Sequence, residues 1–381
     1  MLPFLILKFK TLASHFRPLK IKNIRKETAD CISVCFEIPD DWKEEFQFKH
    51  GQNITVKTVV NGEEIRRSYS ICSSPLDNEL RIAVKKVTNG KFSSYANDYL
   101  KKNHTLDVLA PTGQFFTELH PSNRKNYLAF ASGSGITPVI SIIKTTLAKE
   151  PQSSFSLVYG NRTRSSIIFK EELEALKNRY MDRFSVYYIL SREKADAPLN
   201  QGRIDREKCD IIFKNLLELS AIDDFFVCGP EEMIFSVKNW LEEKGIEKRK
   251  IHFELFTVPG QNSSLSKSNA RKNSFDDASS PQIVNSPIGK INIKLDGIAF
   301  DFELAFNGEP ILDAALKQGA DLPFACKGGV CATCRAKLIS GKVEMDNNYA
   351  LQPEELEAGF ILTCQSHPRT EQLMIDFDVR Q

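Results

Sequence analysis

The chain has 381 residues, of which 41% are hydrophobic and 26% charged, a composition typical of a soluble protein of two or three domains rather than a disordered or membrane protein. Its net charge of +2 gives no basis for nucleic-acid binding. From Ile288 onward, 14 Asp and Glu face 9 Lys and Arg, net −5, which leaves +7 for the rest. This asymmetry predicts electrostatic docking between an acidic end and a basic remainder.

The start of the chain is apolar, but Lys8 and Lys10 end the apolar run far short of the roughly 20 residues of a membrane-spanning helix. The charge order and cleavage site of a signal peptide are also missing. We therefore interpret residues 1–20 as an N-terminal segment packed on the first domain, not as a membrane anchor. The nine cysteines are an odd number, and four of them cluster, so we expect reduced thiols in a cytoplasm.

Residues 21–122 contain short strands. Ile32, Val34, Phe36 and Ile38 alternate with other residues, and further short strands follow between turn signals. This spacing predicts a small antiparallel β-barrel that ends near Phe116.

Two segments of this barrel suit a flavin nucleotide. Arg67-Ser68-Tyr69-Ser70 ends a strand, and Lys91-Phe92-Ser93 follows Asn89-Gly90 into a predicted helix. An arginine, a helix N-terminus and hydroxyl groups can bind a pyrophosphate, while an aromatic ring can stack on a flat ring. Taken alone, the Arg-x-Tyr-Ser segment is equally compatible with an ordinary edge strand.

Residues 123–258 change to buried strands that alternate with helical stretches, which predicts a parallel sheet wrapped by helices. Gly133-Ser134-Gly135-Ile136-Thr137-Pro138 follows the strand 127–131 and opens a helix. Glycines at such a turn let backbone N–H groups approach a nucleotide phosphate. Cys228-Gly229-Pro230 closes another strand and starts the helix expected at 231–244. Each segment alone also fits a plain structural turn.

Residues 259–287 are rich in Ser and Asn and lack an apolar period, which predicts a flexible linker. The last predicted domain, 288–381, begins with two strands and a short helix. Its loop holds Cys326, Cys331 and Cys334, with Cys364 following after 29 intervening residues. This is the plant-type C-x4-C-x2-C…C spacing for a [2Fe-2S] cluster, for which we expect the fourth thiolate to come from a separate strand. A zinc site is the alternative, but the second short C-x2-C pair typical of zinc sites is missing.

In this order and spacing, Arg67-x-Tyr69-Ser70, the Gly133 to Pro138 segment and Cys228-Gly229-Pro230 resemble the ferredoxin-NADP reductase superfamily, here joined to a plant-type ferredoxin. The domain order is similar to that of the reductase subunits of ring 1,2-phenylacetyl-CoA epoxidases. The resemblance implies an antiparallel FAD-binding β-barrel, an α/β nucleotide domain with a parallel sheet, and an α+β β-grasp ferredoxin domain.

The resemblance also implies roles for single residues. Tyr69 would stack on the flavin, and Ser70 would lie near the flavin nitrogen that receives hydride. Thr137 and Cys228 would border the nicotinamide, with Ser70 and Cys228 as the catalytic pair. Phe256 would cover the other flavin face, and Ser191-Arg192 would hold a 2′-phosphate. Basic charge for this phosphate would also come from Arg162, Arg164 and Arg203. The remaining expected cofactor contacts are Arg67, Ser68, Val84, Lys85, Lys91, Phe92, Ser93, Gly133, Gly135, Gly229 and Pro230.

We therefore predict a reductase that takes hydride from NADPH, with NADH as the alternative donor, and passes single electrons from FAD through the cluster. The expected acceptor is a di-iron oxygenase, the phenylacetyl-CoA epoxidase first and another multicomponent hydroxylase second. A [2Fe-2S] redox sensor remains a different kind of hypothesis, and slow turnover with artificial acceptors would favour it. The sequence predicts neither a nucleic-acid partner nor a membrane partner. It gives no indication of the oligomeric state.

Overall fold

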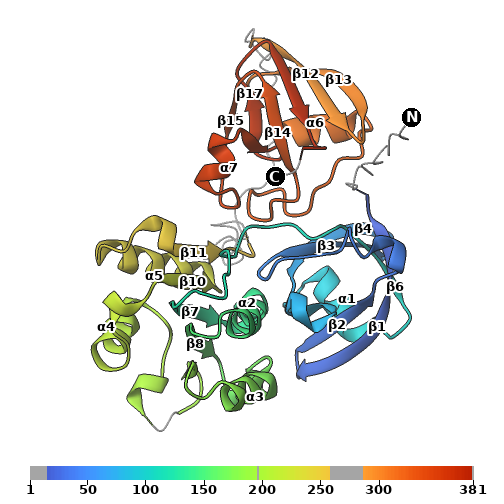
Figure 1. Cartoon of the computed structure of the whole chain (residues 1–381). Coiled ribbons are helices and arrows are strands. Elements are labelled where there is room, and N and C mark those ends of the chain that lie inside the picture. The colour runs from blue at the N-terminus through green and yellow to red at the C-terminus, as the bar shows by residue number, and fades with distance from the viewer. Residues whose placement is uncertain (1–14, 195–196, 258–285, 380–381) are drawn as a thin grey trace, which may run out of the picture. The chain divides into compact units, whose positions relative to one another are not determined.

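The computed structural model describes residues 15–194, 197–257 and 286–379. Most of the segment expected at 1–20 and of the linker expected at 259–287 therefore lies outside the described residues. The chain divides into two units, Arg17–Ser266 and Lys267–Gln381 with Met1–Phe16, and each is described by itself (Figure 1).

The first part of the larger unit is an antiparallel sheet with the strand order β4-β3-β6-β1-β2-β5. A bridge between Ile71 and Ile82 joins the end of β4 to β5, which brings the two edge strands together into a barrel. The Asn61-Gly62 turn joins β3 to β4; both residues have positive φ, as a two-residue hairpin requires. The strands are β1 (Arg17–Thr28), β2 (Cys31–Glu37), β3 (Asn53–Val60), β4 (Glu63–Ser70), β5 (Leu80–Lys85) and β6 (Thr105–Val108).

The barrel begins earlier than we expected. Strand β1 starts at Arg17 and pairs with β6 from Arg17 to Lys20, so residues 17–20 belong to the sheet rather than to a preceding segment. Helix α1 (Lys91–Tyr99) lies where the sequence predicts a helix, directly after Gly90. It buries Phe92 and Ala96 against the barrel core, which includes Leu19, Ile21 and Val34. Burial of these apolar faces holds the helix on the barrel.

The second part of the larger unit is a parallel sheet with the order β11-β10-β7-β8-β9. Helices cover both of its faces (Figure 1). Helix α4 and strand β11 were absent from the prediction. The elements are β7 (Asn126–Ser132), α2 (Ile136–Lys149), β8 (Ser154–Asn161), α3 (Lys170–Arg179), β9 (Phe184–Leu190), α4 (Arg206–Asn215), β10 (Asp224–Cys228), α5 (Glu231–Glu243) and β11 (Ile251–Glu254).

The strand order places a switch point between β7 and β10. The chain leaves β7 toward β8 and β9 on one side, whereas β10 and β11 lie on the other. In open parallel sheets, ligands bind beyond the carboxyl ends of the two strands that flank such a point. The segment that begins at Gly133 follows β7 directly, and Cys228 is the last residue of β10.

The smaller unit has a mixed sheet with the order β13-β12-β18-β14-β16, in which only the β12–β18 pairing is parallel. Helix α6 packs Leu312 and Ala315 on the apolar core beneath this sheet. The elements are β12 (Ile288–Leu295), β13 (Ile298–Ala305), α6 (Ile311–Lys317), β14 (Arg335–Ser340), β15 (Val343–Met345), α7 (Pro353–Glu357), β16 (Phe360–Leu362), β17 (Ser366–Pro368) and β18 (Gln372–Asp376).

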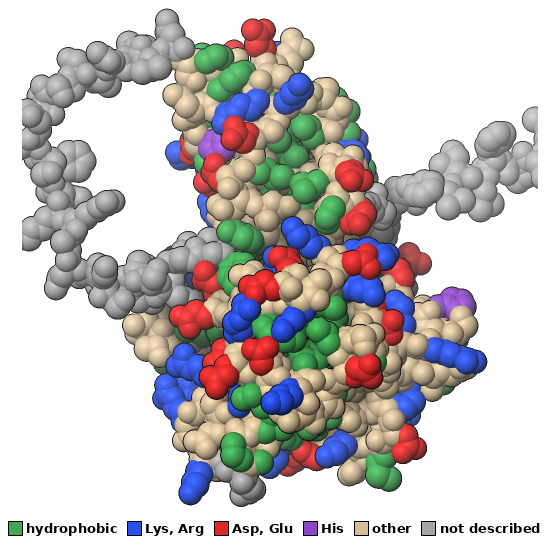
Figure 2. Space-filling view, turned by 90° about the vertical axis from the view of Figure 1, so that its left-hand side faces the viewer, with side chains coloured by type: hydrophobic (Ala, Val, Ile, Leu, Met, Phe, Trp, Pro, Cys, Tyr) green, Lys and Arg blue, Asp and Glu red, His purple; other side chains and the backbone are tan. Residues whose placement is uncertain are grey.

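Short 3-10 helices complete the secondary structure: η1 (Asp40–Trp42), η2 (Pro75–Asp77), η3 (Gly133–Gly135), η4 (Arg164–Ser166), η5 (Pro198–Asn200), η6 (Leu219–Ala221) and η7 (Lys248–Lys250). In the part of the chain that the structure describes, no helix is both long and apolar enough to span a bilayer. On the face drawn in Figure 2, acidic and basic side chains are interspersed over the unit Arg17–Ser266. The excess positive charge of this unit is thus spread among acidic groups on this face.

One buried histidine in the barrel makes the stability of the larger unit depend on pH. His50 is 6% exposed, and its Nε2 has no hydrogen-bond partner among the described residues. Burial lowers the pKa of His50 to about 4. Because the unfolded chain binds this proton near pH 6.5, the unfolded state holds more protons between pH 4 and 6.5, and stability rises with pH in this window.

Because of His50, we expect the free energy of unfolding to fall by about 3 kcal/mol when the pH is lowered from 7 to 4. Urea unfolding, followed by the fluorescence of the two tryptophans, Trp42 and Trp240, measures this directly in the larger unit. His50→Gln should flatten this part of the pH profile. His104→Gln, which changes an exposed histidine, should leave the profile unaltered. An unchanged profile in the His50 variant would refute the assignment.

Candidate cofactor and cluster sites

Strand β4 and helix α1 bring the two predicted flavin segments into contact. The ring centroids of Tyr69 and Phe92 lie 5.4 Å apart. Arg67 is exposed and lies two residues before Tyr69 on β4. Burial raises the pKa of the Tyr69 hydroxyl, which therefore stays neutral. The Ser68 hydroxyl lies 3.0 Å from the Thr55 hydroxyl on β3, which is within hydrogen-bond distance. The Tyr69 ring therefore lies beside the first turn of α1, on the same strand as Arg67.

The turn into α1 is held by the Ser93 hydroxyl. This group accepts a hydrogen bond from the Val87 backbone N–H at 3.1 Å and donates to the Gly90 carbonyl at 3.3 Å. Lys91 is exposed and pairs with Glu63. The bonds of Ser93 orient the first helical N–H groups, which are the groups an anion would meet.

Val84 and Lys85 end strand β5 next to these elements. The Val84 carbonyl accepts a hydrogen bond from the Asn97 amide of α1 at 3.0 Å. The Lys85 ammonium lies 3.8 Å from where a Cβ on Gly133 would be. A barrel residue therefore reaches the glycine turn of the nucleotide domain.

The glycine turn closes tightly on the neighbouring strand. A Cβ on Gly135 would lie 2.1 Å from the Cys228 carbonyl oxygen, so no other residue fits this position without a backbone shift. Gly133 has a φ of 55°, and its carbonyl accepts a hydrogen bond from the Tyr159 hydroxyl at 2.9 Å. Thr137 is buried in the first turn of α2. The two predicted nucleotide segments therefore meet at the switch point of the sheet.

A carboxylate that the sequence analysis did not single out links the two expected catalytic residues. The Ser70 hydroxyl donates a hydrogen bond to the Glu254 carboxylate at 2.9 Å, across 184 positions of sequence. Glu254 is paired in register with Cys228 on the adjacent strand. Burial raises the pKa of the Cys228 thiol and the Glu254 charge raises it further, so the thiol remains protonated. Phe256, two residues after Glu254, is 41% exposed.

The predicted 2′-phosphate residues gather at the carboxyl ends of β8 and β9. The Arg192 backbone N–H donates to the Arg162 carbonyl at 2.9 Å, and the Ser191 N–H donates to the Asn161 carbonyl at 2.9 Å. All three side chains, those of Arg162, Ser191 and Arg192, are exposed. Glu193 instead turns to Arg164, to which it is ion-paired at 3.3 Å.

The cysteine loop wraps on itself through left-handed residues. Lys327, Gly329 and Ala332 have φ values of 51°, 76° and 54°. The Gly328 N–H donates to the Cys326 sulfur at 3.3 Å, as expected for a loop that stabilises thiolates. Cys364 lies in the turn between β16 and β17, so our expectation that it would come from a strand is wrong.

The four thiols form two pairs. A hydrogen bond with Cys331 raises the pKa of Cys326, and the same bond lowers the pKa of Cys331 to about 6. Cys334 and Cys364 form the second pair in the same way. Among the described residues, no group of three or more His, Cys, Asp or Glu could hold a metal ion by itself. A [2Fe-2S] cluster needs two thiolates for each of its two irons, and these two pairs of thiols would supply them.

Three domain families match the chain in consecutive order. The Oxidoreductase FAD-binding domain matches residues 18–117, the Oxidoreductase NAD-binding domain matches residues 130–239, and the 2Fe-2S iron-sulfur cluster binding domain matches residues 293–369. The cofactor classes predicted from the motifs, FAD, a pyridine nucleotide and a [2Fe-2S] cluster, are confirmed at this level.

Known proteins share this organisation over nearly the whole chain. A 1,2-phenylacetyl-CoA epoxidase subunit from Escherichia coli K12 is 40% identical, over 96% of this chain and 98% of that protein. The ferredoxin reductase component of 3-ketosteroid-9-alpha-monooxygenase from Rhodococcus rhodochrous is 32% identical, over 94% and 96%. The structure of phthalate dioxygenase reductase aligns with a TM-score of 0.55 at 23% identity, covering 95% of this chain and 98% of that one.

The fold and the three domains define an NAD(P)H-dependent oxidoreductase that carries electrons through flavin and an iron-sulfur cluster. The predicted fold class is confirmed, with an antiparallel FAD-binding barrel, a parallel nucleotide-binding sheet and a C-terminal ferredoxin domain. The chain belongs to the family of flavin and [2Fe-2S] reductases that includes this 1,2-phenylacetyl-CoA epoxidase subunit.

Proposed function

We propose that this reductase takes hydride from NADPH and delivers single electrons to a di-iron oxygenase, the phenylacetyl-CoA epoxidase being the first candidate. One observation carries the proposal: Ser70 of the barrel and Cys228 of the nucleotide domain both adjoin Glu254. When bound, FAD supplies the conversion from a two-electron donor to one-electron steps. The residues themselves hold, orient and shield the two nucleotides.

The chain's own groups have separable tasks in this proposal. Arg67 and the N-terminus of α1 bind the FAD pyrophosphate, and Tyr69 packs on the flavin ring. Ser70 holds its hydroxyl proton toward Glu254, which fixes the hydroxyl beside the reacting face. Thr137 and Cys228 border the nicotinamide at the switch point. Phe256, which is exposed, covers the other flavin face.

The identity of the acceptor is supported by the names of the relatives. The epoxidase relative at 40% identity favours a phenylacetyl-CoA epoxidase, whereas the 3-ketosteroid relative at 32% favours another multicomponent oxygenase as the second candidate. The experiment measures NADPH oxidation coupled to product formation with each purified oxygenase. Fast turnover with ferricyanide but none with any oxygenase would overturn the proposal, and slow turnover with every acceptor would favour a redox sensor.

We expect the enzyme to prefer NADPH, and Arg192→Ala to lower kcat/KM for NADPH about tenfold while changing that for NADH less than twofold. Loss of a charged hydrogen bond to a phosphate has roughly this effect. Arg249→Ala removes another exposed arginine, located before the amino end of β11, and serves as the control. Equal kcat/KM values for both nucleotides in the unaltered enzyme would contradict the preference.

A chain that ends at Val258 should keep FAD and reduce ferricyanide with NADPH at nearly the full rate, because the barrel and the nucleotide domain each keep their own core. It should reduce the oxygenase at less than about 1% of the rate of the intact chain, since the cluster is missing. Flavin content and the two turnover rates measure this. Oxygenase turnover equal to that of the intact chain would refute the relay through the cluster.

A further inference from the structure

The loop 72–79 of the barrel contacts helix α2 of the nucleotide domain. This contact lies close in sequence to both the proposed flavin site and the proposed nicotinamide site. The loop begins two residues after Ser70, and α2 begins one residue before Thr137. A movement between loop and helix would therefore change the separation of the two sites.

Two buried hydroxyl contacts join the loop to the helix. The Ser141 hydroxyl donates a hydrogen bond to the Ser73 carbonyl at 2.7 Å. The hydroxyls of Ser74 and Thr145 lie 2.9 Å apart. All four residues are at most 2% exposed, so water cannot readily replace these bonds.

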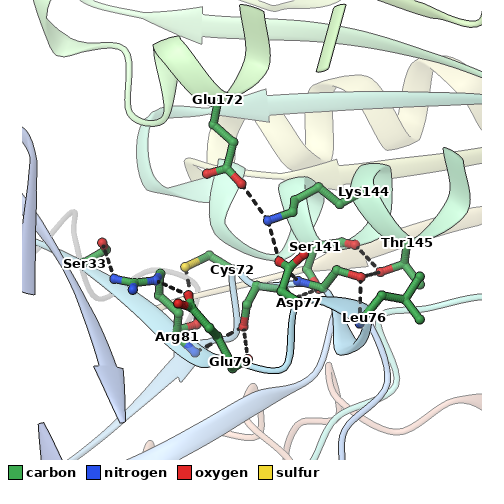
Figure 3. A network of polar contacts seen from close by, with 12 residues as sticks. Ser33, Cys72, Leu76, Asp77, Glu79, Arg81, Ser141, Lys144, Thr145 and Glu172 are labelled. Carbon is green, nitrogen blue, oxygen red and sulfur yellow. Dashed lines mark hydrogen bonds and ion pairs between the residues drawn. The ribbon is translucent and has the colours of Figure 1, made fainter. Parts of the chain in front are cut away.

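Lys144 adds a charged contact between the same two elements. Figure 3 shows its ammonium between Asp77, from the barrel loop, and Glu172, from helix α3. The two distances are 2.5 Å and 2.6 Å, and the lysine side chain is only 18% exposed. Burial lowers the pKa of Lys144, but the two carboxylates raise it above its usual value, so the ammonium stays charged.

The loop is also held firmly from the barrel side. Arg81 is 5% exposed, and its guanidinium donates to the Ser33 hydroxyl at 3.0 Å. The Arg81 backbone N–H donates to the Ser73 hydroxyl at 3.1 Å, and its carbonyl accepts from the Cys72 N–H at 2.8 Å. The polar contacts drawn in Figure 3 therefore run from strand β2 through the loop to α2 and α3.

We propose that Lys144, with Ser141 and Thr145, is a positioning residue that sets the distance between the flavin and the nicotinamide through its ion pair with Asp77. Hydride transfer needs reacting atoms about 3–3.5 Å apart, and a displacement of about 1 Å can cost roughly 100-fold in rate. The inference rests on the proposed flavin and nucleotide sites. It concerns only how the two sites are held relative to each other.

The test compares Lys144→Met with Lys144→Arg and with Lys86→Met in the full chain. Lys86→Met is the matched control because it removes an ion pair, Lys86 to Asp98 of α1 at 2.7 Å, that has no partner in the nucleotide domain. Lys144→Met should slow flavin reduction at saturating NADPH about tenfold with normal FAD content, and Lys144→Arg should recover most of the rate. Lys86→Met should leave the rate within twofold. Hydrogen exchange in the flavin-free protein should speed up at residues 72–77 and 141–145 in Lys144→Met alone.

A second pair of variants separates the cross-domain contact from the local one. Asp77→Asn should slow flavin reduction as Lys144→Met does, while Glu172→Gln, which removes a contact inside the nucleotide domain, should slow it less than twofold. Unchanged reduction and exchange in Lys144→Met would overturn the inference, as would equal effects of the Asp77 and Glu172 variants. If the unaltered enzyme failed to reduce its flavin with NADPH, the proposed function would fail instead.

Discussion

Cys331→Ser is expected to abolish the [2Fe-2S] cluster and to reduce oxygenase-coupled NADPH oxidation to less than about 1%, while FAD stays bound. Cys331 is buried and pairs with Cys326, so Cys331→Ser removes one of the two protein thiolates that would hold one iron. The flavin site lies in the other unit and has its own core. Ferricyanide reduction with NADPH should therefore stay within about twofold of the unaltered rate.

The measurement combines iron and sulfide analysis, the visible spectrum and the two turnover assays. Cys209→Ala is the control, because Cys209 is a buried free thiol of α4 outside the cysteine loop. This variant should keep both cofactors. Zinc in place of iron in protein made without oxygen, or an intact cluster in Cys331→Ser, would exclude the proposed ligand set.

Gly135→Ala is expected to lower the rate of flavin reduction by NADPH at least about 100-fold. The added methyl group would lie 2.1 Å from the Cys228 carbonyl oxygen and 2.7 Å from the Gly229 nitrogen, so the backbone on both sides of the switch point must move. A shift of about 1 Å at the nicotinamide site is enough for such a loss. Overpacking should also cost about 1–3 kcal/mol of stability.

Gly160→Ala provides the matched control at the end of the neighbouring strand. Its methyl group would meet the flexible end of the Ile204 side chain at 3.2 Å, which can shift by a few tenths of an ångström. Stopped-flow absorbance at several NADPH concentrations separates nucleotide affinity from the reduction rate. A Gly135→Ala enzyme that bound NADPH and reduced its flavin normally would show that this close approach is unimportant.

Local patterns predicted much of the fold. Helix α1 follows Gly90 as expected, and the helix expected at 231–244 matches α5 to within one residue at each end. These elements depend on apolar periodicity and on Gly and Pro positions, which are readable within a short window. Helix α4 was not predicted. Strand β11 was not predicted either, because its four residues are too few to show an alternation of apolar and polar side chains.

The spacing of the cysteines and the order of the glycine and serine motifs determined the cofactor classes, because each cofactor imposes its ligands at short, fixed separations. Only the tertiary structure brought Glu254 to Ser70, set the Cys228 carbonyl against Gly135, and placed Lys144 between two domains. Contacts between residues far apart in the chain leave no periodic signal in either segment, since each side chain alone fits an ordinary surface or core position. Such contacts come into being when the sheets assemble and their strand ends meet at one edge.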